Sequence, residues 1–194
     1  LLWLSEVSEF EYSKAIRGGI PLCWPRFGSE DKDLPQHGFA RTFMFELVEV
    51  KDINLDCTHV HLRLKDSKKS KQIWDKKFQL DFIVHISDTL SMELITTNLD
   101  NKNFEITQAL HTYFNVSNIK NISIFGLENK HYLDALDMKT KLQKDSIEFE
   151  NEVDRVYQGV DKKIVLRDKQ RNIYIKNKDS KSVIVWNPWI KKCL

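Results

Sequence analysis

The chain of 194 residues is long enough for one well-packed domain, and its 30 Lys and Arg residues against 28 Asp and Glu residues leave a net charge of only +2. This balance argues against a nucleic-acid-binding protein, and the short apolar runs argue against a membrane-spanning one. Three scattered cysteines, Cys23, Cys57 and Cys193, are too few for a disulfide framework or a zinc knuckle and favour a reducing, cytoplasmic setting.

The first forty residues are rich in glycine and proline. Residues 17–28 and 35–38 together hold four of the six glycines and three of the four prolines, so this region cannot form a central strand. We expect loops with special backbone geometry here, and such loops often carry function. The chain begins with Leu1 rather than Met and shows no signal peptide, so we expect it to be part of a longer polypeptide.

Alternation of apolar and polar residues dominates the rest of the chain. Val60, Leu62 and Leu64, for example, alternate with polar neighbours, and side chains on a strand point in turn to opposite faces. The same period predicts strands at residues 42–50, 59–65, 78–86, 90–94, 104–114, 173–176 and 183–186. Turn signals fall between them, at residues 52–54, 67–70, 98–103, 115–121 and 176–180.

No segment shows a sustained helical stripe of apolar residues. The nearest candidate, residues 132–142, is short and its apolar spacing is irregular. The lysine-rich residues 68–71 and 76–77 are expected to be a solvated loop. The spacing of the strands therefore predicts an all-β sandwich, a single domain over residues 1–194 that is mainly antiparallel, with helix confined to short pieces.

Several polar residues in the early loops could carry chemistry. Arg17 precedes two glycines and offers a planar fork of donors for a phosphate or a sugar diol, although an ordinary turn would look the same. Around Gly38, Gln36 and His37 can hydrogen-bond a hydroxyl group, and Arg41 can pair with an anion. A polar loop without a ligand is an equally good interpretation of this second group.

Later residues add further candidates. His111 lies on the polar parity of its predicted strand, where an imidazole can exchange a proton near neutral pH, although a surface histidine without function is the alternative. Asp154 could accept hydrogen bonds from sugar hydroxyls. His59 and His61 share a polar strand face, but no third ligand stands at a diagnostic spacing, so we predict no metal site.

Five segments, in this order, form a set of motifs: AIRGGIPLCWPRFG at residues 15–28, LPQHGFAR at 34–41, ALHTYF at 109–114, EVDRVY at 152–157 and VWNPW at 185–189. Together they resemble the motifs of the glucose-6-phosphate 1-epimerases, the hexose-6-phosphate mutarotases of the aldose 1-epimerase superfamily. The resemblance covers nearly the whole chain. It implies a large antiparallel β-sandwich of the galactose mutarotase type, incomplete here at both ends, with the site on its concave face.

The resemblance implies a role for each matched position. It assigns the catalytic acid to His111 and substrate binding to Arg17, Gln36, His37, Arg41 and Asp154. It implies a monomeric, cytoplasmic enzyme that interconverts the α and β anomers of a hexose 6-phosphate, glucose 6-phosphate first, by acid–base ring opening without a metal or redox cofactor. The family's catalytic base is a glutamate beyond the VWNPW segment, and no glutamate follows Glu152 in this chain.

Two other functions remain open from the sequence. The first is a non-catalytic protein of the same fold that binds a sugar phosphate, which the missing glutamate would favour. The second is a mutarotase for unphosphorylated aldoses. Two arginines around one proposed site argue against the second function, because a neutral sugar does not need that much positive charge.

Overall fold

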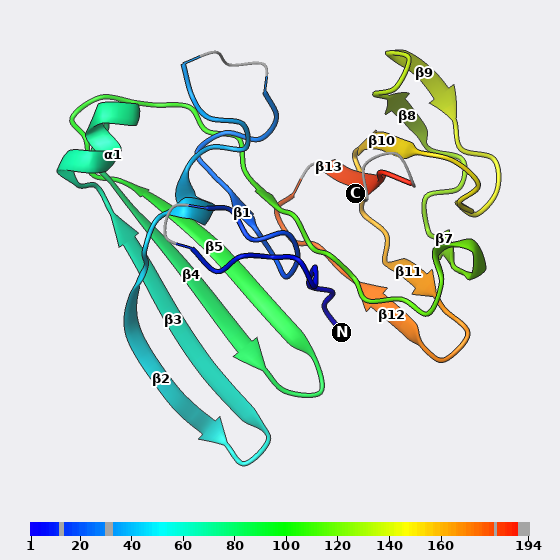
Figure 1. Ribbon diagram of the computed structural model, residues 1–194, viewed down its shortest axis with the longest axis horizontal. Helices are drawn as coiled ribbons and strands as arrows, with labels where there is room; N and C mark the ends of the chain where they lie inside the picture. The colour runs from blue at the N-terminus through cyan, green and yellow to red at the C-terminus, as the bar shows by residue number, and fades with distance from the viewer. Residues whose placement is uncertain (12–13, 30–32, 181, 190–194) are drawn as a thin grey trace. The chain divides into compact units, whose positions relative to one another are not determined.

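The computed structural model describes residues 1–11, 14–29, 33–180 and 182–189. It divides into two compact units, Leu1–Phe114 and Asn115–Leu194. Within the described residues nearly all regular structure is β-strand, paired antiparallel in each sheet (Figure 1). None of the helical segments in these ranges has the length and hydropathy needed to cross a bilayer. The expected antiparallel β-structure is confirmed, and the organisation of residues 1–194 as one domain stays a prediction.

The main sheet of the first unit is an antiparallel meander of four strands (Figure 1). Its strands are β2 (Glu46–Asn54), β3 (Cys57–Lys65), β4 (Phe78–Ile86) and β5 (Leu90–Asn98). The strands predicted at 59–65, 78–86 and 90–94 are therefore confirmed, the last one extending further. The strand predicted to begin at Thr42 begins at Glu46, because Ala40–Thr42 form a 3-10 turn, η1, in which the amide of Phe43 donates to the carbonyl of Ala40.

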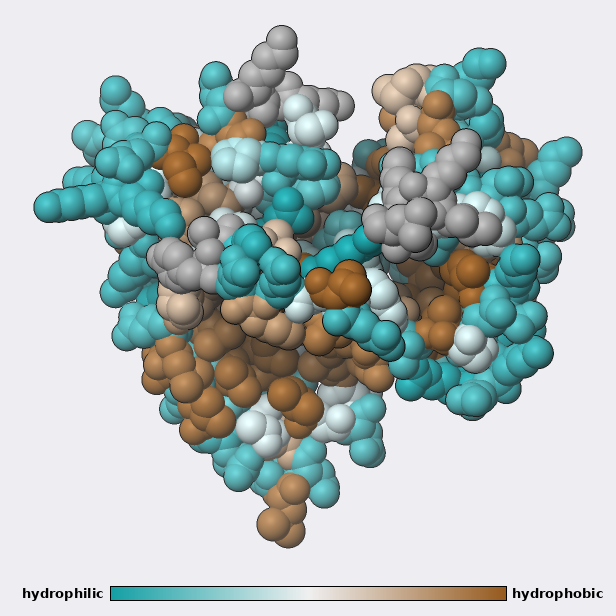
Figure 2. Space-filling model, in the orientation of Figure 1, coloured by the Kyte–Doolittle hydropathy of each residue, from teal (hydrophilic) through white to brown (hydrophobic). Residues whose placement is uncertain are grey.

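The apolar face of this sheet is covered at one end. Leu64, Phe78 and Leu80 are buried there beneath the indole of Trp24, whose ring centroid lies 4.5 Å from that of Phe78. Towards the other end the same face is more open. Val50, on β2 opposite Val60, keeps 55% of its surface exposed. Figure 2 shows apolar side chains gathered over this sheet.

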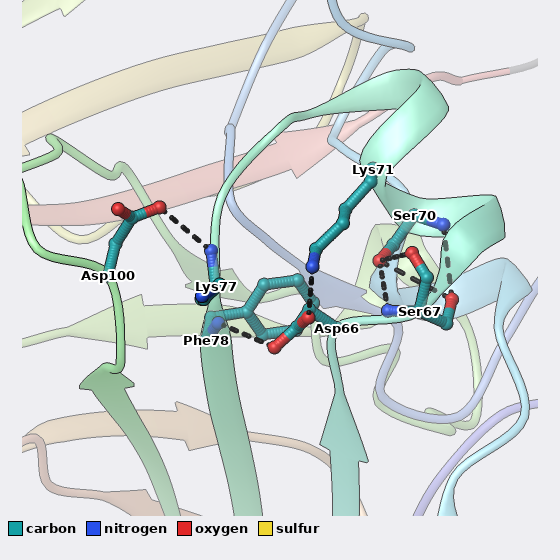
Figure 3. Close-up of polar contacts among 7 residues, drawn as sticks. All are labelled: Asp66, Ser67, Ser70, Lys71, Lys77, Phe78 and Asp100. Carbon is teal, nitrogen blue, oxygen red and sulfur yellow. Dashed lines mark hydrogen bonds and ion pairs between the residues drawn. The ribbon is translucent and has the colours of Figure 1, made fainter.

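A short helix, α1 (Lys68–Ile73), joins β3 to β4 (Figure 3). The amide of Ser70 donates to Ser67 Oγ at 3.1 Å, and the amide of Ser67 donates to Ser70 Oγ at 2.8 Å, so each serine satisfies an amide that the first turn leaves unpaired. Lys71 Nζ lies 3.0 Å from a carboxylate oxygen of Asp66. The expectation of a loop at 68–71 was wrong, because this capping box uses serine in place of the usual Glu or Gln at its third helical position, whereas residues 76–77 do lie in a loop.

The loops before β2 pack along a second extended segment. Strand β1 (Leu22–Cys23) pairs with β6 (Ala109–Leu110), and neither is longer than two residues. The amides of Thr107, His111 and Tyr113 donate to the carbonyls of Pro25, Pro21 and Gly19. The strand predicted over 104–114 is therefore wrong outside β6, because this backbone bonds irregular loop residues that cannot form a regular ladder.

Gly38 fixes how these loops pack. It has a φ of +69°, and the two amides that follow it, those of Phe39 and Ala40, both donate to the carbonyl of Trp24. A Cβ at Gly38 would lie 2.1 Å from that carbonyl oxygen. Gly19 has a similar φ of +63°, but no atom of the described residues lies within 4 Å of the place where its Cβ would stand.

The second unit contains two small antiparallel sheets, ordered β13-β10-β8-β9 and β12-β11-β7. Their strands are β7 (Ser123–Phe125), β8 (His131–Asp134), β9 (Lys139–Leu142), β10 (Val153–Gln158), β11 (Ile164–Arg167), β12 (Asn172–Ile175) and β13 (Ser182–Asn187), with a 3-10 turn, η2 (Ile119–Asn121), before them. The strands predicted at 173–176 and 183–186 are confirmed to within one residue. Residues 132–142, the nearest candidate for a helix, form most of the β8–β9 hairpin.

The two glycines give a matched test of the loop packing. Gly19→Ala should cost about 1–2 kcal/mol of unfolding free energy, because an L-residue is strained in the left-handed region. Gly38→Ala should cost about 3 kcal/mol or more, because overpacking against the Trp24 carbonyl adds to the same strain. Urea unfolding followed by far-ultraviolet circular dichroism measures both changes, and equal losses would show that the contact with Trp24 does not matter.

Candidate functional site

Five of the six residues that the sequence singled out belong to the first unit, and they lie on the loops around β1 and β6. These are Arg17, Gln36, His37, Arg41 and His111. Gln36 has an exposed side chain, and the other four are half-buried. The carbonyl of Arg17 accepts hydrogen bonds from the amide of Ser5 at 3.0 Å and from Ser8 Oγ at 3.2 Å, which anchors this loop to the start of the chain.

His111 follows β6 directly and is held by aromatic stacking. Its imidazole lies parallel to the phenol ring of Tyr113, with centroids 4.7 Å apart and planes 17° apart. Tyr113 stacks in turn on Trp3 at 5.8 Å. His111 and Tyr113 therefore share a face, although no regular strand runs through them. The stacked rings restrict how the imidazole can turn.

His37 faces the same place from the second loop. It has a φ of +62°, and its Nδ1 accepts a hydrogen bond from the amide of Gly28 at 3.1 Å. A neutral ring must therefore carry its proton on Nε2. The imidazole centroid lies 6.1 Å from that of His111, with the planes nearly perpendicular, and 5.0 Å from the ring of Phe27.

Two arginines direct positive charge at this group. Arg41 donates from Nη2 to the carbonyl of Gln36 at 3.0 Å. Burial raises the pKa of Tyr113, and the charges of Arg17 and Arg41 both oppose this rise. The charges of both guanidinium groups therefore act on the half-buried phenol of Tyr113.

The positive charge also affects the two imidazoles. Burial, followed by the charge of Arg41, holds the pKa of His37 and of His111 below the usual histidine range. Both rings are therefore mainly neutral at pH 7. Cys23 lies beneath them in β1, and burial raises the pKa of its thiol to about 11, which leaves it protonated and unreactive.

Asp154, the sixth predicted residue, belongs to the second unit. It lies on β10 opposite Trp186 of β13, and its carbonyl accepts a hydrogen bond from the amide of Ala135. Tyr157, on the same strand, is fully buried and donates from its hydroxyl to Gln143 Oε1 at 2.7 Å. The strand that carries Asp154 is thus firmly held, and its predicted role towards a sugar stays a prediction.

The arrangement in the first unit suits an anionic ligand that exchanges protons. The guanidinium groups can pair with a phosphate, and the two neutral imidazoles can each give or take a proton. No group of three or more metal-ligating side chains occurs in the part of the chain that the structure describes.

Sequence reasoning missed the aromatic partners of the site. Tyr113 could have been found, because it stands two residues from His111 on the same polar parity. Trp3 and Phe27 carry no such signal, since their positions depend on how the loops fold back. In the loops, the amide of Trp3 donates to the carbonyl of Tyr113, and the amide of Phe27 donates to Thr107 Oγ1.

Comparison with known proteins identifies relatives of this chain. A protein of Cenchrus ciliaris provisionally named glucose-6-phosphate 1-epimerase is 37% identical, over 99% of this chain and 62% of its own length. A protein of Escherichia coli with the same provisional name is 34% identical, over 97% of this chain and 64% of its own length. The chain thus spans less than two thirds of these curated relatives.

Solved structures agree on the fold. A protein of Salmonella typhimurium, provisionally described as a mutarotase, superposes with a TM-score of 0.89 at 32% identity, covering 96% of this chain and 63% of that one. A protein of Synechocystis sp. superposes with a TM-score of 0.87 over 98% of this chain and 70% of that one, and at 21% identity it shows the fold alone. The predicted fold, antiparallel and of the galactose mutarotase type, is confirmed. The sequence profile described as Aldose 1-epimerase matches residues 2–194, and the chain therefore belongs to the aldose 1-epimerase family.

Proposed function

We propose that this site binds a hexose 6-phosphate, with glucose 6-phosphate as the first candidate, and that it interconverts the α and β anomers. One observation carries the proposal: the half-buried Arg17 and Arg41 belong to the loops that hold the stacked rings of His111 and Tyr113. A site for a neutral sugar would not need two half-buried cations in these loops, whereas a phosphate would pair with them. The provisional names of the relatives agree with this substrate class.

Each residue has a role in the proposal. Arg17 and Arg41 hold the phosphate, while Gln36 and His37 hydrogen-bond sugar hydroxyls, His37 from its Nε2–H. The resemblance also implies a substrate-binding role for Asp154, which lies on β10 of the second unit. His111 exchanges a proton with the ring oxygen, and its stacking on Tyr113 keeps the imidazole aimed at that atom.

The reaction moves two protons and one C–O bond. A base takes the proton from the hydroxyl on C1, the C1–O5 bond breaks as the aldehyde forms, and His111 protonates O5. Rotation about C1–C2 and reclosure with the roles reversed give the other anomer. The resemblance gives the base as a glutamate, and because none follows Glu152 in these 194 residues, we assign that role to no residue of this chain.

The charge of the substrate also prepares the acid. To protonate O5, His111 must first hold a second proton, and burial, followed by the charge of Arg41, opposes this by lowering its pKa. A phosphate dianion bound to Arg41 offsets that charge and lets the pKa rise. The phosphate therefore serves both binding and protonation, which favours phosphorylated over neutral sugars at the chemical step.

Small-molecule sugar phosphates are free in the cytoplasm, and we propose that location, with a monomer as the active form. Cys23 and Cys57 are free thiols, as a reducing compartment would keep them. Cys193 lies outside the described residues.

The first test concerns the phosphate. Arg41→Ala should weaken binding of glucose 6-phosphate about tenfold to a hundredfold, because it removes a charge-assisted hydrogen bond, and should change glucose binding little. Titration calorimetry measures both. Lys68→Ala, which removes one charge from the exposed surface of α1, is the control. Equal losses for the two sugars would assign the site to unphosphorylated aldoses.

The second test follows the pKa of His111. It should lie below the usual histidine value in the free protein and should rise when glucose 6-phosphate binds, because the dianion favours the charged imidazolium. Glucose should leave it unchanged, and Arg41→Ala should raise it without ligand. NMR titration of the ring protons follows each case. A pKa that falls or stays constant with glucose 6-phosphate contradicts the proposed link between phosphate and acid.

The third test concerns catalysis, in a polypeptide that also carries the family's glutamate. His111→Asn keeps size and polarity but cannot protonate O5, so exchange between the anomers of glucose 6-phosphate should slow by about a hundredfold or more. Saturation-transfer NMR at fixed pH measures the exchange. His131→Asn, an exposed position on β8, should retain the wild-type rate. A His111 variant as fast as wild type would reduce this residue to a binding group.

A further inference from the structure

The polar face of the β2–β3–β4 sheet carries a second pair of imidazoles. His59 on β3 stands directly opposite His85 on β4. His59 Nδ1 and His85 Nε2 are 3.1 Å apart, and the ring centroids are 4.9 Å apart. The His59 side chain is only 14% exposed, so its position depends on packing rather than on free rotation.

A carboxylate lies beside this pair. Glu49 on β2 places Oε2 3.4 Å from His59 Nε2 and accepts from Lys51 Nζ at 2.8 Å. Because a carboxylate oxygen can only accept, this contact favours the tautomer of His59 that carries its proton on Nε2 and leaves the lone pair of Nδ1 facing His85. An outer carboxylate that orients an imidazole in this way is a usual feature of metal sites.

The third histidine on this face, His61, interacts with Asp81 and not with the His59–His85 pair. His61 Nε2 lies 2.6 Å from Asp81 Oδ1, and the same carboxylate accepts hydrogen bonds from Arg63 and Gln79. Asp81 is buried, so these contacts are well defined. His61 is therefore a neighbour of the pair and not a member of it.

We propose that His59 Nδ1 and His85 Nε2 together bind a divalent transition-metal cation that prefers imidazole, with Zn²⁺ as its representative. Zinc bonds to imidazole nitrogen at about 2.0–2.1 Å, which in tetrahedral geometry separates two such nitrogens by about 3.3–3.4 Å. The observed 3.1 Å needs an opening of only a few tenths of an ångström. In the bound state neither coordinating nitrogen carries a proton, so each neutral ring holds its proton on the other nitrogen, His59 on Nε2 and His85 on Nδ1, and water completes the coordination.

Such a site joins two neighbouring strands and should stabilise them. The described residues offer no group of three or more metal ligands, so binding is weaker than at a closed structural zinc site and the ion exchanges with solvent. Because the ion binds the folded sheet, it raises the unfolding temperature by an amount that grows with the logarithm of the free ion concentration once that concentration exceeds the dissociation constant. The site lies apart from the arginine-flanked histidines and does not depend on the proposed epimerase function.

The test is Zn²⁺ titration of the chain, followed by calorimetry and by thermal unfolding. Wild type should bind one ion at this site and unfold at a higher temperature with it. His85→Asn and His59→Asn should each weaken binding at least tenfold and abolish the thermal shift. Glu49→Gln should weaken it about tenfold through the outer contact. His61→Asn and His111→Asn remove imidazoles outside this site, so both variants should bind Zn²⁺ with the wild-type affinity.

A second measurement needs no variant. In ¹⁵N NMR spectra of the wild type, Zn²⁺ should shift His59 Nδ1 and His85 Nε2 first. The proposal is overturned if wild type binds no Zn²⁺, if His59→Asn or His85→Asn binds it as well as wild type, or if the first ring nitrogens to shift belong to other histidines.

Discussion

The first unit depends on the contacts of a single residue, Trp24, through both its backbone and its side chain. Its carbonyl accepts the amides of Phe39 and Ala40, which joins the two loops that carry the candidate site. Its indole is fully buried and donates from Nε1 to Thr96 Oγ1 at 2.9 Å, which joins the same loops to β5. A polar atom buried without a partner would cost free energy, so the indole has one satisfactory position. The fixed position of the indole in turn fixes the positions of these loops.

The candidate site in turn depends on charge placed beside half-buried imidazoles. Water would screen Arg41 and leave the histidines little affected, but partial burial lets one guanidinium act on His37, His111 and Tyr113 together. Both imidazoles are therefore mainly neutral in the free protein. In the proposed function, a phosphate bound to Arg41 offsets its charge, and a neutral sugar does not. Specificity for a phosphorylated sugar and protonation of its ring oxygen would then share one physical cause.

The sequence could predict the parts of the fold where one local pattern decides the structure. Strands β3 and β4 were found almost to the residue, because one face packs on the Trp24 core and the other is polar, which forces strict alternation. Residues 104–114 show the same alternation, but their backbone bonds to loops, so the pattern predicted a longer strand than the one that forms. Helix α1 is too short for a periodic signal. The sequence singled out Arg41 by its polar loop and His111 by its strand parity, and their roles stay predictions. The stacking of Trp3 on Tyr113 depends on loop geometry that no local pattern encodes.

The two histidine pairs show how neighbours decide what one residue type can bind. His37 and His111 lie in the field of Arg41, which disfavours both a second proton and a metal ion and favours an anion. His59 and His85 lie beside Glu49, whose own pKa is held low by its hydrogen bond to Lys51, so a carboxylate charge faces the pair at neutral pH. That charge favours a cation. Sequence spacing could not separate these cases, because His85 becomes the partner of His59 only through the register of β3 on β4.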